Sequence, residues 1–173
     1  MTQIASYGSW KSPITTELMT AKAIGLGQVA LDGTDVYWLE SRPLEGGRNA
    51  LMKCASGAEP VECLPPEFNV RSRVHEYGGG AYAVFDGVIY FINFRDQRLY
   101  RLEPGRTPEV LTSAEGYRYA DFALDRAHNR LICVREDHTG GGEAVNAIVA
   151  VSLNGDDNGD RKSTRLNSSH GKL

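Results

Sequence analysis

A unit of short strands and tight turns repeats along this chain, and this repeat limits what the chain can fold into. Each unit begins with a strand, an aspartate-containing turn and a second strand, and then continues through a longer loop to further strands. The three turn aspartates, Asp32, Asp86 and Asp125, lie 54 and 39 residues apart. Runs rich in β-branched and aromatic residues between glycine-containing turns are typical of strands in an all-β protein.

The first two units contain four predicted strands each, and the third contains three. They span residues 28–64, 81–112 and 119–153. Four antiparallel strands per unit, repeated about every 45–50 residues, are typical of β-propeller blades. A sandwich of about ten strands would account for the strands but not for their repeated order of short turn, long loop and short turn. We therefore predict an all-β partial β-propeller with two four-stranded blades and most of a third.

The N-terminal segment, residues 1–27, carries the one helix signal in the chain. Ser12 is a favourable N-cap and Pro13 a favourable first helical residue, so a short helix is predicted over Ile14 to Ala23. We expect this segment to precede an incomplete propeller over residues 28–155.

The C-terminal residues 156–173 contrast with the units before them. They are rich in Asn, Ser, Gly and charge and lack apolar periodicity, which predicts disorder. Arg161 to His170 also resembles a translated sequencing-adapter read-through, so we expect this tail to be artefactual. Since two blades and most of a third do not close a ring, we expect the chain to be the front part of a longer protein.

Composition excludes several classes of protein. The 173 residues are 41% apolar and 24% charged, with a net charge of −3, which fits a soluble domain and argues against a nucleic-acid or membrane-surface partner. No apolar run approaches the roughly 18 residues of a spanning helix, and no signal-peptide pattern opens the chain. We expect a cytoplasmic protein whose cysteines, Cys54, Cys63 and Cys133, are free thiols. A Cys54–Cys63 disulfide is the alternative.

Six motifs occur in a fixed order along almost the whole of residues 4–155. They are S-Y-G-S-W-K-S-P-I-T (Ser6 to Thr15), V-Y-W-L-E-S-R-P-L-E-G-G-R (Val36 to Arg48), N-V-R-S-R-V-H-E-Y-G-G-G-A-Y (Asn69 to Tyr82), F-R-D-Q-R-L-Y-R (Phe94 to Arg101), Y-R-Y-A-D-F (Tyr117 to Phe122) and V-R-E-D-H (Val134 to His138). Together they resemble the N-terminal propeller of the prolyl oligopeptidase family of serine peptidases. The nearest resemblance is to its bacterial dipeptidyl aminopeptidase and acylaminoacyl-peptidase-like branch.

This resemblance implies a protein of two domains with different roles. In that family the propeller gates a C-terminal α/β-hydrolase domain, which carries a Ser-Asp-His triad and cleaves short peptides. The hydrolase domain would lie beyond the end of this chain and would be its partner. The chain itself contains no G-x-S-x-G nucleophile elbow. We therefore expect no catalytic residue and no cofactor here, and no activity from the chain alone.

Motifs of other chemistries start in this sequence but are not completed. His75-Glu76 begins like H-E-x-x-H, but Gly79 stands where the second histidine would be. Gly78 to Gly80 opens a predicted strand rather than a helix, so it presents no helix N-terminus to a phosphate. Because the H-E-x-x-H pattern is incomplete, we expect no metal site.

Charged residues gather in one set of loops. In an antiparallel four-stranded blade, the loops after the second and fourth strands leave one rim, and those after the first and third leave the other. Arg71, Arg95, Asp96 and Arg118 belong to the first set. The candidate site residues of this rim are Arg42, Glu45, Arg48, Arg73, His75, Glu76, Asp137 and His138.

Two interpretations of this rim remain open. The charges could form structural ion pairs between blades, or they could form a docking face for the catalytic domain or a wall of the substrate chamber. Arg73, His75 and Glu76 are the strongest functional candidates, because the three glycines that follow them allow a close backbone approach.

Two other functions also remain open. A free-standing propeller could serve as a binding module, and a lactonase-like propeller would need inward carboxylates from several blades. The sequence shows no such set of carboxylates. The coding sequence downstream of Leu153 discriminates the peptidase from the binding module, because the peptidase requires a G-x-S-x-G motif there.

Overall fold

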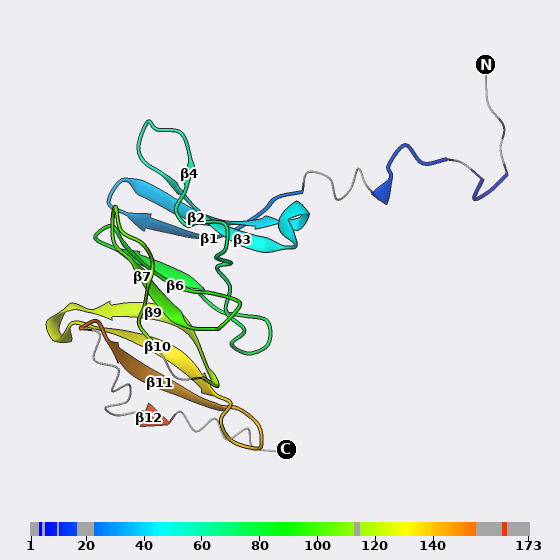
Figure 1. Ribbon diagram of the computed structural model, residues 1–173. Helices are drawn as coiled ribbons and strands as arrows, with labels where there is room; N and C mark the ends of the chain where they lie inside the picture. Colours follow the sequence, from blue (N-terminus) through cyan, green and yellow to red (C-terminus); the bar gives the residue numbers. More distant parts are fainter. Residues whose placement is uncertain are drawn as a thin grey trace, which may run out of the picture.

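The computed structural model of this chain contains three antiparallel sheets, stacked in sequence order from top to bottom in Figure 1. The structure describes residues 4, 6–9, 11–16, 23–112 and 115–154, and the strand at 164–165. The first sheet contains β1 (Gly25–Asp32), β2 (Asp35–Arg42), β3 (Arg48–Cys54) and β4 (Val61–Glu62). The second contains β5 (Tyr82–Phe85), β6 (Val88–Ile92), β7 (Leu99–Leu102) and β8 (Glu109–Val110). The third contains β9 (Tyr117–Asp125), β10 (Arg130–Asp137), β11 (Val145–Ser152) and β12 (Thr164–Arg165).

Each sheet is a meander in which neighbouring strands follow one another in the sequence. The predicted all-β partial propeller is therefore confirmed. After Gly27, the described residues form only two short 3-10 helices, η1 (Pro43–Glu45) and η2 (Arg126–His128). No helix of the described part is long and apolar enough to cross a bilayer. Most of the helix predicted over residues 14–23 lies outside the described residues.

The third sheet differs from its prediction at one edge. A three-stranded sheet with nothing packed after Asp156 was expected, but β12 pairs with β11 through Ala147↔Arg165 and Ile148↔Thr164. That prediction is wrong at these two positions, because an edge strand offers free backbone groups that a two-residue strand can pair with. The rest of residues 156–173 lies outside the described residues, and its artefactual origin stays a prediction.

The middle sheet is buried on both faces. Ile89 and Phe91 of β6 pack on the first sheet, in a cluster that includes Tyr37 and Leu51. The alternate residues Tyr90 and Ile92 belong to the cluster with the third sheet. Because both faces of β6 are covered, its sequence is apolar throughout rather than alternating.

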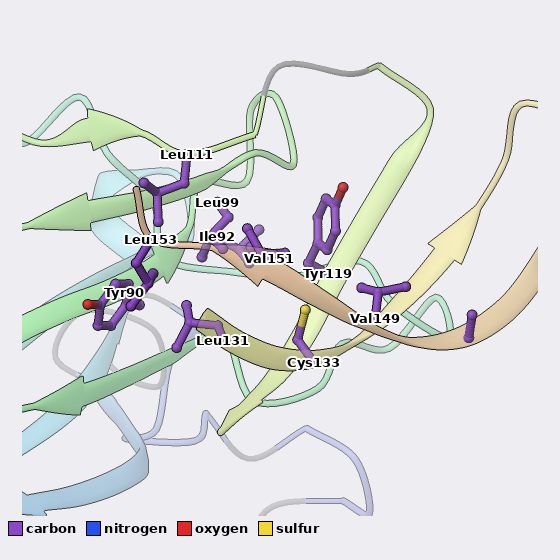
Figure 2. Close-up of a cluster of buried hydrophobic side chains, with 11 residues drawn as sticks. Tyr90, Ile92, Leu99, Leu111, Tyr119, Leu131, Cys133, Val149, Val151 and Leu153 are labelled. Carbon is purple, nitrogen blue, oxygen red and sulfur yellow. The ribbon is translucent and has the colours of Figure 1, made fainter. Parts of the chain in front are cut away.

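The second cluster fills the space between the middle and third sheets (Figure 2). Leu131 of β10 and Val149 and Val151 of β11 contribute from the third sheet, opposite Ile92 and Leu99. Leu131, Ile92 and Leu99 are each 0% exposed. Stability therefore comes largely from contacts between successive sheets, as in other repeat proteins.

The repeated aspartates join neighbouring turns. The Asp32 carboxylate accepts hydrogen bonds from the backbone N–H groups of Asp86, at 3.1 Å, and Gly87, at 2.6 Å. Asp86 in turn forms an ion pair with Arg126, next to the equivalent turn of the third sheet. Asp125 instead pairs within its own sheet, with Arg130 at 2.8 Å. The first two aspartates of the sequence repeat thus each bridge to the next blade.

The cysteines form no disulfide. Cys54 and Cys63 are half-buried free thiols, and Cys133 is a buried one. Burial raises the pKa of Cys63 to about 11 and that of Cys133 to about 12. The prediction of free thiols is confirmed, and the alternative disulfide is wrong.

Candidate functional site

The charged rim is built around the segment of residues 69–80, which links β4 to β5 and which we call the connector. Val70, Ser72 and Val74 are almost fully buried, at 0%, 2% and 0% exposure, whereas Arg71 and Arg73 between them are exposed. This alternation is that of a half-buried extended strand. It fixes which side of the connector carries the arginines.

Hydrogen bonds from the connector reach all three sheets. The Val70 N–H donates to Asn49 O, at the start of β3, at 2.9 Å. The Arg71 N–H donates to Ile92 O of β6 at 3.1 Å. The Ser72 hydroxyl donates to Tyr119 O of β9 at 2.7 Å. The connector therefore holds the three blades in register at this rim.

Gln97 fixes the connector to the loop after β6. Its Oε1 accepts from the Arg73 N–H at 2.8 Å, and its Nε2 donates to Phe94 O at 2.9 Å. Gln97 is only 8% exposed, and its backbone has a φ of +56°. A buried amide that is satisfied on both sides cannot easily exchange partners, so the backbone that carries Arg73 is held in one place.

The connector ends in glycines that pass close to the third sheet. A Cβ on Gly79 would lie 2.9 Å from the Ala120 Cβ, and a Cβ on Gly80 would lie 2.8 Å from Asp121 Oδ1. The Gly79 carbonyl also accepts from Gln28 Nε2 of β1 at 3.1 Å. The expected close backbone approach at these glycines is confirmed.

Glu136 organises the first of two charged clusters on the rim. Its side chain is 6% exposed, and its Oε1 accepts from the His75 backbone N–H at 2.7 Å. His75 Nδ1 lies 3.2 Å from the same oxygen, and His138 Nε2 lies 3.0 Å from Oε2. Both histidines thus reach one carboxylate, at the end of β10. We call these three residues, with Glu76 and Arg118, the Glu136 cluster.

Arg118 completes the Glu136 cluster from β9. Its guanidinium lies 3.9 Å from Glu136 Oε2, and it donates to Glu76 at 3.0 Å and to the Arg73 carbonyl at 3.1 Å. His75 and Glu76 have positive φ values of +56° and +64°. Non-glycine residues seldom adopt this region, and such strain collects at functional sites.

Arg42, Glu45 and Arg48 form the second cluster, within the first sheet. Arg42 donates to Glu40 at 2.9 Å and to Glu62 at 2.7 Å. Arg48 donates to Glu62 at 2.6 Å and to Glu45 at 2.7 Å. We call these five residues the Glu62 cluster. It lies in β2, η1, β3 and β4, so it joins strands of one blade rather than two blades.

The charges of the Glu62 cluster stabilise one another. Burial alone would raise the pKa of Glu62, but hydrogen bonds from Arg48 and Arg42 outweigh it and hold that pKa below its ordinary value. The hydrogen bond to Glu62 raises the pKa of Arg48, against the opposing effect of burial. Glu62 and Arg48 are therefore both ionised near neutral pH.

The Asp137 carboxylate makes its hydrogen bonds within its own turn. It accepts from the hydroxyl and the N–H of Thr139, at 2.6 and 2.9 Å, and these bonds hold its pKa below the ordinary value. It closes a local turn. The structure thus brings His75, Glu76 and His138 together, and separately Arg42, Glu45 and Arg48. Arg73 joins the first group only through its backbone carbonyl, while its guanidinium lies over the Phe94 ring.

Three acidic residues of the two clusters were missed by the sequence reasoning: Glu40, Glu62 and Glu136. The signals for two of them lie in the strand pattern, one across a strand pair and one along a single strand. Glu136 faces Arg118 across β9 and β10, and Glu40 lies two residues before Arg42 on the same face of β2. Glu62 lies in a strand of two residues, and only its pairing with Met52 places it near the arginines.

Neither cluster combines a nucleophile with a general base. No group of three or more His, Cys, Asp or Glu residues in the described part has a metal-binding arrangement. The two clusters instead hold fixed charges on the rim.

Comparison with solved structures identifies close structural relatives. A Mycobacterium tuberculosis puromycin-hydrolyzing peptidase superposes with a TM-score of 0.80 and 34% identity over 94% of this chain. Puromycin hydrolase superposes with a TM-score of 0.80 and 35% identity over 95% of this chain, and a mutant of it complexed with PGG gives 34% over 94%. The chain spans 27% of the length of each of these proteins. No family model and no curated protein matches the chain.

Proposed function

Because this chain belongs to the prolyl oligopeptidase family of serine peptidases, we propose that it forms the propeller portion that gates a C-terminal α/β-hydrolase domain. The observation that carries the proposal is the match of nearly the whole chain to a minor part of each puromycin-hydrolysing peptidase. The remainder of such a protein has room for a separate catalytic domain, which would be the partner of this chain.

The charged rim is the part of the chain that we assign to this role. Its connector is fixed to all three sheets, so its side chains form a surface that does not need to reorganise when a partner docks. Arg73, His75, Glu76 and His138 stand on that surface and are the residues that we expect to contact the catalytic domain or line the substrate chamber. The Glu62 cluster supports the first blade from within. We propose short peptides as substrates, in the manner of a dipeptidyl aminopeptidase, and the cytoplasm as the compartment.

The experiment begins with the coding sequence downstream of Leu153, recovered from genomic DNA. The complete protein and the present chain are expressed side by side and assayed with aminoacyl and acyl-peptide chromogenic substrates. We expect turnover by the complete protein, loss of turnover with a serine-directed inhibitor, and none by the present chain. A stop codon after further blades, without a G-x-S-x-G motif, would instead establish a free-standing binding module.

The gating role has its own test in the complete protein. Arg118→Gln removes the donor that links Glu76, Glu136 and the connector. We expect it to change the ratio of kcat/KM between a dipeptide substrate and a longer peptide. Arg106→Gln, at an exposed arginine in the loop after β7, is the matched control and should leave this ratio unchanged. Equal ratios in both variants would contradict gating through the rim.

A further inference from the structure

Two arginines of the connector converge on one aromatic ring. The Cζ atom of Arg71 lies 5.0 Å from the centroid of the Phe94 ring, and that of Arg73 lies 4.3 Å from it. Phe94 follows β6, and the connector pairs with this stretch through the bridge Val70↔Asn93. The pairing places both guanidinium groups on the same half-buried ring.

These two guanidinium groups lack an acidic partner among the residues that the structure describes. Within the part of the chain that the structure describes, neither Arg71 nor Arg73 forms an ion pair, and neither does Arg95, which follows Phe94. The rim arginines Arg42 and Arg118, by contrast, are both paired. Positive charge is therefore left uncompensated at this one part of the rim.

The nearest aspartate in the sequence is already engaged. Asp96 accepts from Asn93 Nδ2 at 3.2 Å and from the Arg98 N–H at 3.2 Å. Its other oxygen accepts from the Tyr100 hydroxyl at 2.7 Å. Asp96 thus shapes the loop, and in the described part of the chain it forms no ion pair with Arg71 or Arg73.

The pair is also held in place before any ligand arrives. The Arg71 N–H is bonded to Ile92 O, and the Arg73 N–H to Gln97 Oε1. The Phe94 ring attracts both guanidinium groups through its negative face, which lowers the cost of bringing two like charges together. A guanidinium that stacks through its face keeps its N–H edge free for a planar, two-bond contact with a carboxylate.

We propose that Arg71 and Arg73, over Phe94, form a carboxylate-binding site that takes the C-terminal carboxylate of a short peptide. The ring beside the two N–H edges offers an apolar surface to the last side chain of such a peptide, which a free inorganic anion would not use. The inference rests on the proposed function for its ligand class, and on the geometry of these three residues for its place.

The test measures binding to the 173-residue chain by nuclear magnetic resonance titration, with trialanine and its C-terminal amide as probes. The acid should shift the side-chain N–H signals of Arg71 and Arg73 and the ring signals of Phe94. The amide, which lacks the charge, should bind about tenfold more weakly, the usual effect of one charge-assisted contact. Arg73→Gln should weaken binding of the acid by about the same factor.

Arg106→Gln is the control, because it removes the same charge from an exposed arginine that already pairs with Glu103. We expect its affinity for the acid to stay within about twofold of the original, since an exposed pair contributes little. Equal binding of acid and amide, equal weakening by Arg73→Gln and Arg106→Gln, or no shift at Arg71, Arg73 and Phe94 would overturn the proposal. The shifts are read in the unsubstituted chain, so they decide the matter even if Arg73→Gln fails to fold.

The outcome is separable from that of the proposed function. If the chain binds trialanine but the complete protein has no peptidase activity, the proposed function is contradicted and the carboxylate site is supported. If the complete protein is active but the chain binds acid and amide equally, the proposed function is supported and the carboxylate site is contradicted. Saturation by acetate with the same affinity as trialanine would show a general anion site and overturn the peptide assignment.

Discussion

Asp121 and Gly80 exchange two hydrogen bonds at the junction of the second and third sheets. The Gly80 N–H donates to Asp121 Oδ1 at 2.7 Å, and the Asp121 N–H donates to Gly80 O at 2.9 Å. Asp121 lies in β9 with a φ of +59°, at an irregularity in its pairing with β10. Gln28 has the equivalent place in β1, with a φ of +50°, and bonds to Gly79 and Ala81. The irregular edge strands β1 and β9 thus both bond to the same glycine segment.

The first prediction concerns the close approach of Gly79 to β9. Gly79→Ala should destabilise the chain by about 1–3 kcal/mol, because the added Cβ would lie 2.9 Å from the Ala120 Cβ and force the blades apart. Urea unfolding followed by tryptophan fluorescence measures the change. Gly141→Ala is the control, because a Cβ there meets nothing within 4 Å. A Gly79→Ala variant as stable as the control would show that the close approach does not matter.

The second prediction concerns Glu136. Glu136→Ala should cost about 2–3 kcal/mol, because it removes a buried carboxylate and leaves the half-buried His75 N–H without its acceptor. Thermal or urea unfolding of the variant measures this cost. Glu115→Ala removes the same charge from a side chain that is 92% exposed and should change stability by less than about 0.5 kcal/mol. Similar losses in both variants would argue against a special role for Glu136.

The third prediction is a pH dependence that arises from Glu62. The folded pKa of Glu62 is lowered below its ordinary value of 4.5, so its contribution to stability is present above that value and is lost as the pH falls through the folded pKa. Since the side chain is 27% exposed, Glu62→Gln should cost only about 1 kcal/mol at pH 7.

The measurement for Glu62 is urea unfolding of the original chain and of Glu62→Gln from pH 7 down to pH 3. The difference between the two should shrink below about pH 4.5. A difference that grows in acid, or that stays constant down to pH 3, would show that the sign or the group is wrong.

The fourth prediction concerns association through β1. Leu26, Val29 and Leu31 of this strand are 71%, 69% and 70% exposed, which makes the strand the most open apolar element of the sheets. The double variant Val29→Thr/Leu31→Thr should shift the chain toward the monomer in sedimentation velocity, because exposed apolar surface drives self-association. Leu44→Thr changes a single exposed leucine of η1 and should have little effect. Unchanged association in the double variant would place the contact elsewhere.

The order of the strands followed from the sequence, as did every strand except β12. Turn residues such as Asp32-Gly33 and Asp86-Gly87 mark chain reversal through local backbone preferences, and the strands between them show their apolar pattern directly. The charged rim was also predictable, because the loops alternate between two rims in any antiparallel meander. His75 and His138, 63 positions apart in the sequence, were expected on one rim, and both contact Glu136.

Pairing between specific side chains did not follow from the sequence. Glu136 was not singled out, because a glutamate at the end of a strand is usually solvated, and its burial depends on the connector folding over it. The pairing of β12 with β11 likewise depends on an edge that exists only once the third sheet has formed.

The sequence by itself determined the three blades and the close glycine approach at the end of the connector, because these depend on backbone preferences and a period of two along each strand. Tertiary structure alone decided which charges meet. Glu62 joins Arg42 and Arg48, Glu136 joins two histidines, and Arg71 and Arg73 are left together on Phe94. These contacts join residues that are distant in the chain. They depend on how the strands and sheets pack, and a local pattern of residues does not reveal that packing.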